Sequence, residues 1–376
     1  MELNAKTSRR LPLTAMGIVC ALGADAATVA RQMAAGNAPG MKRLDGLADG
    51  DSTVFGFADG LPCPGSIGEH CPVPGGLPRV GAIVDMAMSQ IAAALESAKK
   101  EFGSERIGAV VGTSNSTMEE FTDNPDTIDM SYPARRIKER WGVAGPCWSV
   151  STACSSSTKA FASARRLLYG GRCDAVVVGG ADAYTRTVVE GFHSLGALSP
   201  GLARPLAADR DGINIGEGAA FFLMRRDAAY EAGATVYMLG VGESSDAYHM
   251  TAPDPEGRGA EAAMRAALAD AGLTPEDIDF VNLHGTGTRQ NDDMECRAVR
   301  RIFGGPEPGP SASPADGLAV RAFSTKRLTG HCLGAAGAIE AALCWLELGK
   351  RPGTCLSNSF AFGGSNASIA LSSRII

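Results

Sequence analysis

Unbroken apolar runs alternate along the chain with segments in which apolar residues recur at helical spacing. The runs IGAVVG (107–112) and AVVVGG (175–180) predict strands buried on both faces, as in a parallel sheet covered by helices. Helical spacing predicts helices over 82–100, 159–169 and 259–271, the last of them ending at Gly272. Residues 304–317 are rich in Gly, Pro and Ser, which predicts a surface loop. Together these segments predict an α/β fold.

Three features of the sequence occur twice and in the same order. A strand closes on Gly-Thr at Thr113 and Thr286, and a Ser-Thr pair opens a helix of small residues at Ser151 and Ser324. A Gly-Gly pair lies beside a strand at 179–180 and again at 363–364. Thr286 follows Thr113 by 173 positions, and Ser324 follows Ser151 by the same 173. Matching offsets indicate a duplicated βα unit, although common small residues also match by coincidence.

Composition narrows the class of protein. The net charge of −6 gives no global attraction to nucleic acid or to an anionic membrane. No apolar run reaches about 18 residues, the usual minimum for a membrane-spanning helix. Ten cysteines without a framework spacing predict reduced thiols in the cytoplasm. Cys63, His70 and Cys71 match no zinc-ligand pattern, so no metal site is predicted.

Cys154 lies between the strand-like segment CWSVSTA and the helix-like segment SSSTKAFASARRLL. A thiol at a helix N-terminus feels the positive end of the helix dipole, which lowers the thiol pKa and favours the nucleophilic thiolate. Position alone does not distinguish this case from a buried inert cysteine, which is the commoner one.

Two of the five histidines lie in the duplicated turns. His284 ends the strand that precedes Thr286, and His331 follows STKRLTG. Strand ends in a duplicated α/β sheet converge on one crevice, so we expect Cys154, His284 and His331 to meet there. A lone histidine at a strand end is more often structural. Two in equivalent positions, together with a cysteine, favour a catalytic site.

Other residues near these turns have both a functional and a plainer interpretation. Lys326, five positions before His331, is either a solvated surface lysine or a group that orders the two histidines. Phe360 and Phe362 precede a Gly-Gly pair, which suits core aromatics on a strand or a mobile gate. No phosphate-binding loop, complete GxGxxG or HExxH pattern occurs, so nucleotide-dependent roles have no support.

At these residues the chain resembles the β-ketoacyl-acyl-carrier-protein synthase I/II group of condensing enzymes. The matching stretches occur in the family's order along nearly the whole chain. No single stretch is specific to the family, but their combination is. It implies a thiolase-like fold of two βα halves, 1–225 and 226–376, in a layered αβαβα architecture. The matching stretches are STACSSS around Cys154, RPLAADRDGINIGEGAA (204–220), ESSDAYHMTAPDPEG (243–257), HGTGTRQND (284–292), STKRLTGHCLGAAGAIEA (324–341) and SNSFAFGGSNAS (357–368).

The resemblance also implies a mechanism and a set of roles. Cys154 takes an acyl group from a carrier-protein thioester, and His284 and His331 hydrogen-bond the malonyl thioester carbonyl as carbon dioxide leaves. The carbanion then attacks the acyl carbonyl and yields a β-ketoacyl thioester. No cofactor is implied beyond the phosphopantetheine of the acyl carrier protein. The other implied residues are Lys326, which organises the histidines, Glu340, Thr286 and Thr288 as supporting residues, and Phe362, Phe360 and Gly363 at the gate, where the N–H of Phe362 completes an oxyanion hole with that of Cys154.

The chain departs from the family pattern in three places. Ala361 stands where the family usually has Gly, which suggests a stiffer gate. The segment between Trp345 and Ser357 is much shorter than in relatives, which predicts that a loop and a strand are missing there. The cap before Trp148 is also short.

Three alternative functions are open to a chain of this kind. The first is a non-catalytic partner subunit of the chain-length-factor type, which usually lacks the nucleophile that Cys154 supplies here. The second, a degradative thiolase, would carry another cysteine near a C-terminal CxG motif, where this chain has SNSFAFGG. The third, a cysteine hydrolase, explains neither the second histidine nor Lys326.

The resemblance implies an acyl carrier protein as partner, and such proteins are acidic. We therefore expect a local basic patch, with Arg135, Arg136 and Lys138 in PARRIKER (133–140) and Arg204 as candidates. A solvated helix face explains PARRIKER equally well. The family implies a homodimer, with a heterodimer containing a ketosynthase-like partner as the alternative. Neither the acyl chain length nor the choice between fatty-acid elongation and an aryl polyene or polyketide pathway follows from the sequence.

Overall fold

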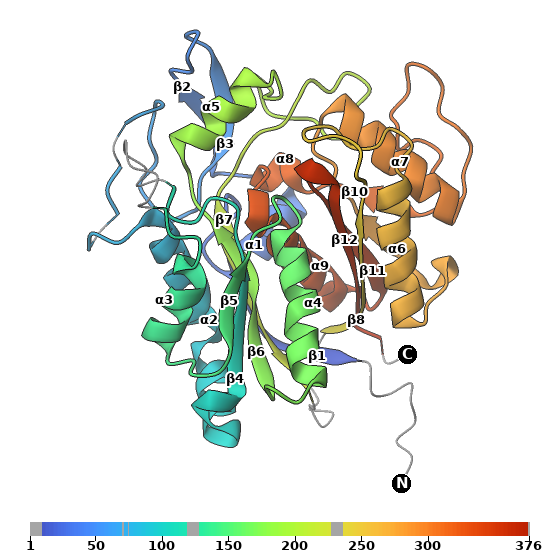
Figure 1. Cartoon of the computed structure of the whole chain (residues 1–376). Helices are drawn as coiled ribbons and strands as arrows, with labels where there is room; N and C mark the ends of the chain where they lie inside the picture. Colours follow the sequence, from blue (N-terminus) through green and yellow to red (C-terminus); the bar gives the residue numbers. More distant parts are fainter. Residues whose placement is uncertain (1–9, 70, 74, 119–127, 227–235, 375–376) are drawn as a thin grey trace.

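Ten strands form one mixed sheet in the computed structural model, which describes residues 10–69, 71–73, 75–118, 128–226 and 236–374 (Figure 1). A separate two-stranded hairpin stands apart from this sheet. The strands of the sheet are β1 (Leu11–Val19), β4 (Ile107–Gly112), β5 (Cys147–Val150), β6 (Ala175–Asp182), β7 (Gly218–Arg225), β8 (Val236–Ser245), β9 (Phe280–Asn282), β10 (Arg321–Phe323), β11 (Thr354–Phe360) and β12 (Ser365–Ser372), and the hairpin is β2 (Met41–Asp45) with β3 (Ser52–Gly56).

The sheet repeats one topology twice. Five strands lie in the order β5, β4, β6, β7, β1, and the other five in the order β10, β9, β11, β12, β8. Numbered along the chain, both sets run third, second, fourth, fifth, first, with the same pattern of parallel and antiparallel pairs. The antiparallel pairing of β1 with β8 joins the two sets. This repetition is the structural counterpart of the sequence repeat, and the division at 225 and 226 remains our proposal for its boundary.

Helices separate and cover the two sets of strands in five layers. Helices α4 and α9 lie between the sets, since α4 packs against β4, β6 and β12 and α9 against β6, β7 and β11. Helix α2 covers the outer face of the first set, and α6 covers that of the second. The helices are α1 (Ala26–Ala35), α2 (Arg79–Phe102), α3 (Tyr132–Trp141), α4 (Ser156–Tyr169), α5 (Arg186–Ser194), α6 (Arg258–Ala271), α7 (Arg289–Phe303), α8 (Lys326–Thr329) and α9 (Ala336–Lys350).

The sequence predictions hold for the helices and need correction for the sheet. Helices 82–100, 159–169 and 259–271 are present, and α6 ends at Gly272 with φ of 69°, a left-handed value that glycine adopts without strain. Residues 304–317 form a loop without helix or strand. The sheet is mixed rather than parallel, because β6 pairs antiparallel with β7. Continuous apolar runs report burial on both faces and say nothing of strand direction.

Two further expectations concern short segments. The Gly-Gly pairs are not equivalent, since 179–180 lie inside β6 whereas 363–364 lie in the turn after β11. In the segment before Ser357 that is shorter than in relatives, a connection of three residues, 351–353, joins α9 to β11. Among the described helices, none is both long and apolar enough to cross a membrane.

Candidate active site

Cys154 stands in a tight turn between β5 and α4. Ala153 has φ of 51°, in the left-handed region that non-glycine residues seldom occupy, and such backbone strain concentrates at functional sites. Glycines on the neighbouring strands let the start of α4 approach. A Cβ on Gly112 would lie 2.2 Å from the backbone nitrogen of Ser157, and one on Gly180 would lie 2.7 Å from the Ser157 Cβ. The last residue of β4 and an internal residue of β6 are therefore glycines where the start of α4 needs room.

The structure brings Cys154 together with both predicted histidines. The Cys154 Sγ lies 3.0 Å from the His331 Nε2. The rings of His284 and His331 meet edge to face, with centroids 5.1 Å apart. One potential ligand atom from each of the three residues lies within 4.8 Å of the others. The thiol comes from the first set of strands, and both imidazoles come from the second.

Lys326 lies behind the histidines and not on the surface. Its Nζ donates to the backbone oxygen of His284 at 2.5 Å, lies 3.3 Å from the His284 Nδ1 and forms an ion pair with Glu340. Both side chains of the ion pair are 2% exposed. Because Nδ1 faces the Lys326 donor, the Nε2 of His284 is left to carry the ring proton toward the cavity.

Burial dominates the electrostatics of the site. It raises the pKa of the Cys154 thiol to about 12, although the charge of Lys326 and hydrogen bonds from the backbone N–H groups of Phe362 and Cys154 act in the opposite direction. It also lowers the pKa of His284 and His331 well below 6.5, helped by the charge of Lys326. The expected lowering of the thiol pKa by the helix dipole is therefore wrong. A helix dipole contributes at most about 2 kcal/mol, whereas the rise of the Cys154 pKa from 9.0 to about 12 corresponds to about 4 kcal/mol.

Alkylation of Cys154 tests this thiol directly. We expect its rate with iodoacetamide to rise about tenfold per pH unit from pH 7 to 9, with no plateau near the ordinary thiol pKa of about 8.5. The measurement is mass spectrometry of the peptide that carries Cys154, with Cys154→Ser as the background control. A plateau below pH 8 would instead show a thiolate stabilised in the free enzyme.

The gate residues lie at the end of β11, where Phe360 is the buried last residue of the strand and Phe362 and Gly363 follow it at the rim of the site. Phe362 is 39% exposed and stacks on Phe192 with ring centroids 5.6 Å apart. Gly363 has φ of 80°, and its N–H donates to the Met250 oxygen at 2.8 Å. Ala361 is extended, with φ of −112°, so this backbone accepts an alanine where the family pattern has glycine. A stiffer gate with alanine at this position stays a prediction.

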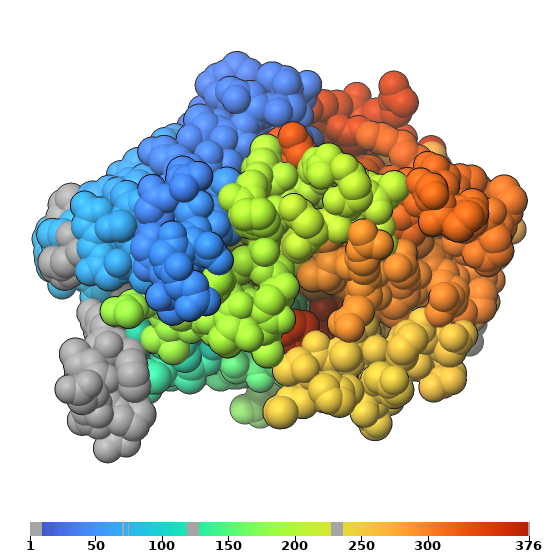
Figure 2. Space-filling view, turned by 90° about the horizontal axis from the view of Figure 1, so that it is seen from above, coloured from blue at the N-terminus to red at the C-terminus, as the bar shows by residue number. Residues whose placement is uncertain are grey.

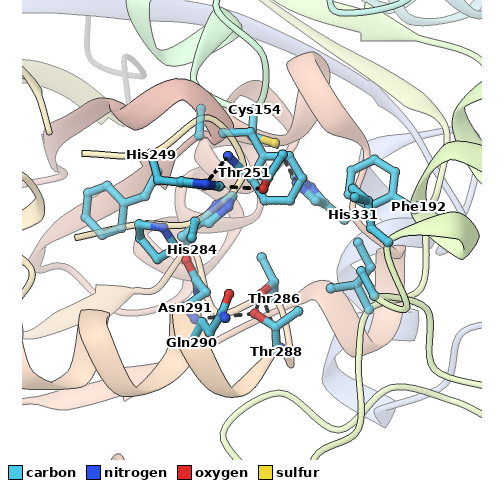
Figure 3. Close-up of a pocket in the computed structure, with 18 of the residues that line it drawn as sticks. Cys154, Phe192, His249, Thr251, His284, Thr286, Thr288, Gln290, Asn291 and His331 are labelled. Atoms are coloured by element: carbon cyan, nitrogen blue, oxygen red, sulfur yellow. Dashed lines mark hydrogen bonds between the residues drawn. The ribbon is translucent and has the colours of Figure 1, made fainter. Parts of the chain in front are cut away.

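A cavity of about 330 Å³ connects these residues to the surface. Figure 2 shows a hollow on the upper face, bordered by green, yellow and orange segments, with red residues at its floor. Figure 3 shows Cys154 and both imidazoles above Thr286 and Thr288, whose hydroxyl oxygens are 3.1 Å apart. The lining residues that were not predicted from the sequence include Phe192, His249, Thr251 and Gln290, and the last three of these lie within the matching stretches 243–257 and 284–292.

Buried carboxylates that sequence reasoning missed hold the turns of the site. Glu295 accepts the N–H groups of His284 and Gly285, each at 2.8 Å. In the first half, Asp182 accepts the Thr113 hydroxyl at 2.6 Å and the Ser114 N–H at 2.9 Å. Each half thus fixes the turn after its second strand with one acid. The only indication of this role in the sequence was that Glu295 and Asp182 are acidic residues in segments expected to be buried.

The predicted basic patch is not part of this site. Arg135 pairs with Asp129, Arg136 with Asp85 and Arg204 with Asp209. Lys138 is exposed on α3. None of the four predicted residues lines the active-site cavity. Local acids engage the three arginines, so their sequence cluster does not translate into free positive charge.

The cysteine and two histidines resemble a metal-ligand set but have the geometry of a hydrogen-bonded site. Zn–S and Zn–N bonds of about 2.3 and 2.0 Å at a tetrahedral angle place the two ligand atoms about 3.5 Å apart. Here the Cys154 Sγ and His331 Nε2 are 3.0 Å apart, and the Lys326 cation lies behind the rings. The absence of a metal site stays a prediction, and the separation of Cys154 and His331 is consistent with it. His70, from the other candidate metal group, lies outside the described residues.

Two family models match the chain, the beta-ketoacyl synthase N-terminal domain over 76–229 and the beta-ketoacyl synthase C-terminal domain over 236–352. The chain belongs to the β-ketoacyl synthase family. This synthase is 32% identical to Nodulation protein E of Rhizobium sp. (strain N33), over 96% of its own length and 98% of the relative's. It is 31% identical to 3-oxoacyl-[acyl-carrier-protein] synthase 2 of Coxiella burnetii, over 78% and 82%.

A solved structure extends the comparison to the fold of the synthase. The ketosynthase (ApeO) in complex with its chain length factor (ApeC) from Xenorhabdus doucetiae matches with a TM-score of 0.83 and 36% identity, covering 99% of this chain and 100% of that chain. The predicted thiolase-like fold and condensing-enzyme family are confirmed. The synthase is thus an acyltransferase of the condensing type in fatty-acid or specialised synthesis.

Proposed function

We propose that this synthase joins an acyl group on Cys154 to malonyl-acyl-carrier protein by decarboxylative condensation. The observation that carries the proposal is the meeting of one buried thiol with two neutral imidazoles in a single cavity. A thiol and one histidine would suffice for a hydrolase. The second imidazole, oriented by Lys326, supplies a donor for a second oxyanion.

Acyl transfer to Cys154 is the first step. The His331 Nε2 takes the thiol proton as the sulfur attacks the thioester carbonyl, so no free thiolate has to form in the buried site. The carbonyl oxygen becomes an oxyanion, for which the N–H groups of Cys154 and Phe362 are the donors. The carrier sulfur leaves as a thiolate that takes a proton from water, the thiol proton stays on the His331 Nε2, and the acyl group remains on the Cys154 sulfur.

Decarboxylation and carbon–carbon bond formation follow. The malonyl thioester loses carbon dioxide, and the electron pair of the broken bond forms an enolate whose oxygen accepts hydrogen bonds from the His284 and His331 Nε2 atoms. The enolate carbon attacks the acyl carbonyl, and the Cys154 sulfur leaves as a thiolate that recovers its proton from the His331 Nε2. The buried walls keep water from hydrolysing the acyl enzyme. Thr286 and Thr288 line the path along which the phosphopantetheine arm would enter.

Replacing either histidine tests the enolate step. His284→Asn and His331→Asn should each lower the rate of malonyl decarboxylation about 100- to 1,000-fold, because each removes one donor to the developing oxyanion. Carbon dioxide release from malonyl-acyl-carrier protein is the measurement. His193→Asn, a change to a half-buried histidine on α5 that does not line the cavity, is the control. Wild-type decarboxylation in His284→Asn would contradict the assignment.

The partners and setting belong to the same proposal. A carrier protein is named by the relatives called 3-oxoacyl-[acyl-carrier-protein] synthase 2. The ketosynthase and chain length factor complex supports a heterodimer with a ketosynthase-like subunit, and homodimerisation stays a prediction. We place the enzyme in the cytoplasm, where its ten cysteines would remain the free thiols that the structure shows. It needs no cofactor of its own, because the carrier protein brings the phosphopantetheine.

An elongation assay decides between an active synthase and a chain-length-factor-like subunit. Purified protein, malonyl-acyl-carrier protein and a series of acyl primers would be combined with and without a candidate partner subunit. Turnover by the protein alone rules out the non-catalytic alternative, and the best primer defines the chain length and pathway. Absence of turnover in both arms would overturn the proposal.

A further inference from the structure

The loop between β8 and α6, residues 246–257, brings a third histidine to the active-site cavity. His249 is exposed and lines the cavity together with the buried His284 and His331. Figure 3 shows these three residues around the same space. Ala247, two positions earlier in the loop, has φ of 48°, backbone strain of the kind that concentrates at functional sites. The steps of the proposed condensation use the two buried rings and give His249 no role.

Two backbone hydrogen bonds tie the loop that carries His249 to the gate turn. The Asp246 N–H donates to the Gly364 oxygen at 2.9 Å. In the other direction, the Gly363 N–H donates at 2.8 Å to the oxygen of Met250, the residue after the histidine. The backbone on each side of His249 is therefore fixed relative to the gate, although the loop itself is exposed.

A further hydrogen bond fixes the tautomer of His249. The Thr251 N–H donates to the His249 Nδ1 at 3.1 Å, so this nitrogen is an acceptor and the Nε2 carries the ring proton. Within the described ranges of the chain, the His249 Nε2 has no hydrogen-bond partner. His249 thus provides a free N–H donor at the rim of the cavity.

The two substrates of the proposed reaction differ in charge. The malonyl thioester carries a carboxylate, whereas the acyl primer is neutral. Among the described residues that line the cavity, none is a lysine, arginine, aspartate or glutamate. The donors on His284 and His331 are assigned to the thioester oxygen. A carboxylate that enters this space gives up water and needs another donor in exchange.

Most other polar side chains of the lining are committed to contacts of their own. The side-chain amides of Asn291 and Asn366 each donate to a carboxylate, and the two cavity threonines of the segment 284–292 hydrogen-bond each other. Gln290 lies at the start of α7, beside the threonines that line the path of the pantetheine arm. His249 is therefore the donor best placed to meet a charged group that only one substrate carries.

We propose that the His249 Nε2–H donates a hydrogen bond to the carboxylate of the malonyl thioester and so distinguishes the extender from the acyl primer. The assignment rests on the proposed function and adds a specificity-determining residue to it. A single hydrogen bond at an exposed rim suits this task. It recognises the carboxylate without stabilising it so strongly that the loss of carbon dioxide is opposed.

His249→Leu tests the contact by kinetics. We expect the KM for malonyl-acyl-carrier protein to rise about tenfold with kcat within about twofold of wild type, because a charge-assisted hydrogen bond made in the ground state is lost. Transfer of the acyl primer to Cys154 should keep its wild-type rate, since the primer has no carboxylate. His249→Gln, which keeps an N–H donor, should recover most of the lost affinity.

Tyr248→Leu is the matched control in the same loop. Tyr248 precedes His249, is 55% exposed and is not among the described residues that line the cavity. We expect a wild-type KM for malonyl-acyl-carrier protein in this variant. An equal rise in Tyr248→Leu would assign the effect to the shape of the loop and overturn the role of the imidazole.

Titration with two unreactive probes measures recognition apart from turnover. The probes are amide analogues of malonyl pantetheine and acetyl pantetheine, in which nitrogen replaces the thioester sulfur, and they differ only in the carboxylate. The wild-type chain should bind the malonyl probe about tenfold more tightly than the acetyl probe. His249→Leu should bind the two probes equally, and Gln290→Leu should keep the wild-type preference.

The outcomes separate the two proposals. Equal binding of both probes by the wild type, or a preference retained in His249→Leu, would overturn the assignment of His249. A preference lost in Gln290→Leu and kept in His249→Leu would give the role to the other donor. Wild-type protein that prefers the malonyl probe but condenses no substrate would overturn the proposed function, while the titration would still decide the role of His249.

Discussion

Cys154→Ala should lose condensation by about ten-thousand-fold or more while keeping the decarboxylation of malonyl-acyl-carrier protein. The loss follows because no other group in the cavity can carry the acyl chain, and removing a catalytic nucleophile has effects of this size. Decarboxylation should survive because Lys326 keeps its contacts with His284, and the His331 Nε2, freed from the Cys154 Sγ, can still donate to the enolate oxygen. The measurements are β-ketoacyl product and carbon dioxide from the same reaction, together with the mass of the acylated protein.

Cys147→Ala is the matched control for this experiment. Cys147 lies at the start of β5, only seven residues before the nucleophile, and its thiol donates to the Ala134 oxygen at 3.1 Å. We expect normal condensation and a normal acyl-enzyme mass in this variant. Condensation retained in Cys154→Ala, or an acyl adduct on another cysteine, would defeat the mechanism.

Lys326→Met should destabilise the protein by about 3–5 kcal/mol. The change removes one partner of a fully buried ion pair and leaves the Glu340 carboxylate uncompensated. Burial also raises the pKa of Glu340 to about 7, so the carboxyl should take up a proton in the variant. Urea unfolding at pH 8 and pH 6 measures both effects, with a smaller loss expected at pH 6, where protonation removes the lone charge.

A second variant separates stability from catalysis at this pair. Lys326→Met/Glu340→Leu replaces the ion pair with apolar groups of similar size and should restore most of the lost stability. It should still decarboxylate slowly, because no cation then donates to His284. A stable double variant with wild-type activity would show that Lys326 acts only in folding.

Much of the site was predictable because its chemistry lies in repeated local patterns. The equal offsets of Thr113 to Thr286 and Ser151 to Ser324 match strands of equal rank in the two halves. Cys154 follows β5 and His284 follows β9, and the strand ends of the two repeats converge across the helices α4 and α9 that lie between them. Corresponding strand ends of a duplicated fold were expected to converge in this way, which is why both residues could be placed in one crevice without any proximity in sequence.

Other properties depend on contacts between distant segments and were not predictable. The direction of the thiol pKa shift was wrong because burial by surrounding segments outweighs the local helix dipole. Arg136 on α3 looked free in the sequence because its partner, Asp85, lies 51 positions away. Glu295 went unnoticed because only the folded chain shows that its carboxylate receives the N–H groups of His284 and Gly285.

The repeated strand order has a consequence for how such an enzyme loses activity. The sulfur is supplied by one repeat and both imidazole rings by the other, and β1 and β8 form the hydrogen-bonded seam between them. Damage far from the cavity that lets the repeats slide along this seam would separate the reacting groups while each repeat stays folded. Loss of turnover would therefore report misalignment of the two repeats, even in a sample whose secondary-structure spectrum is that of the intact protein.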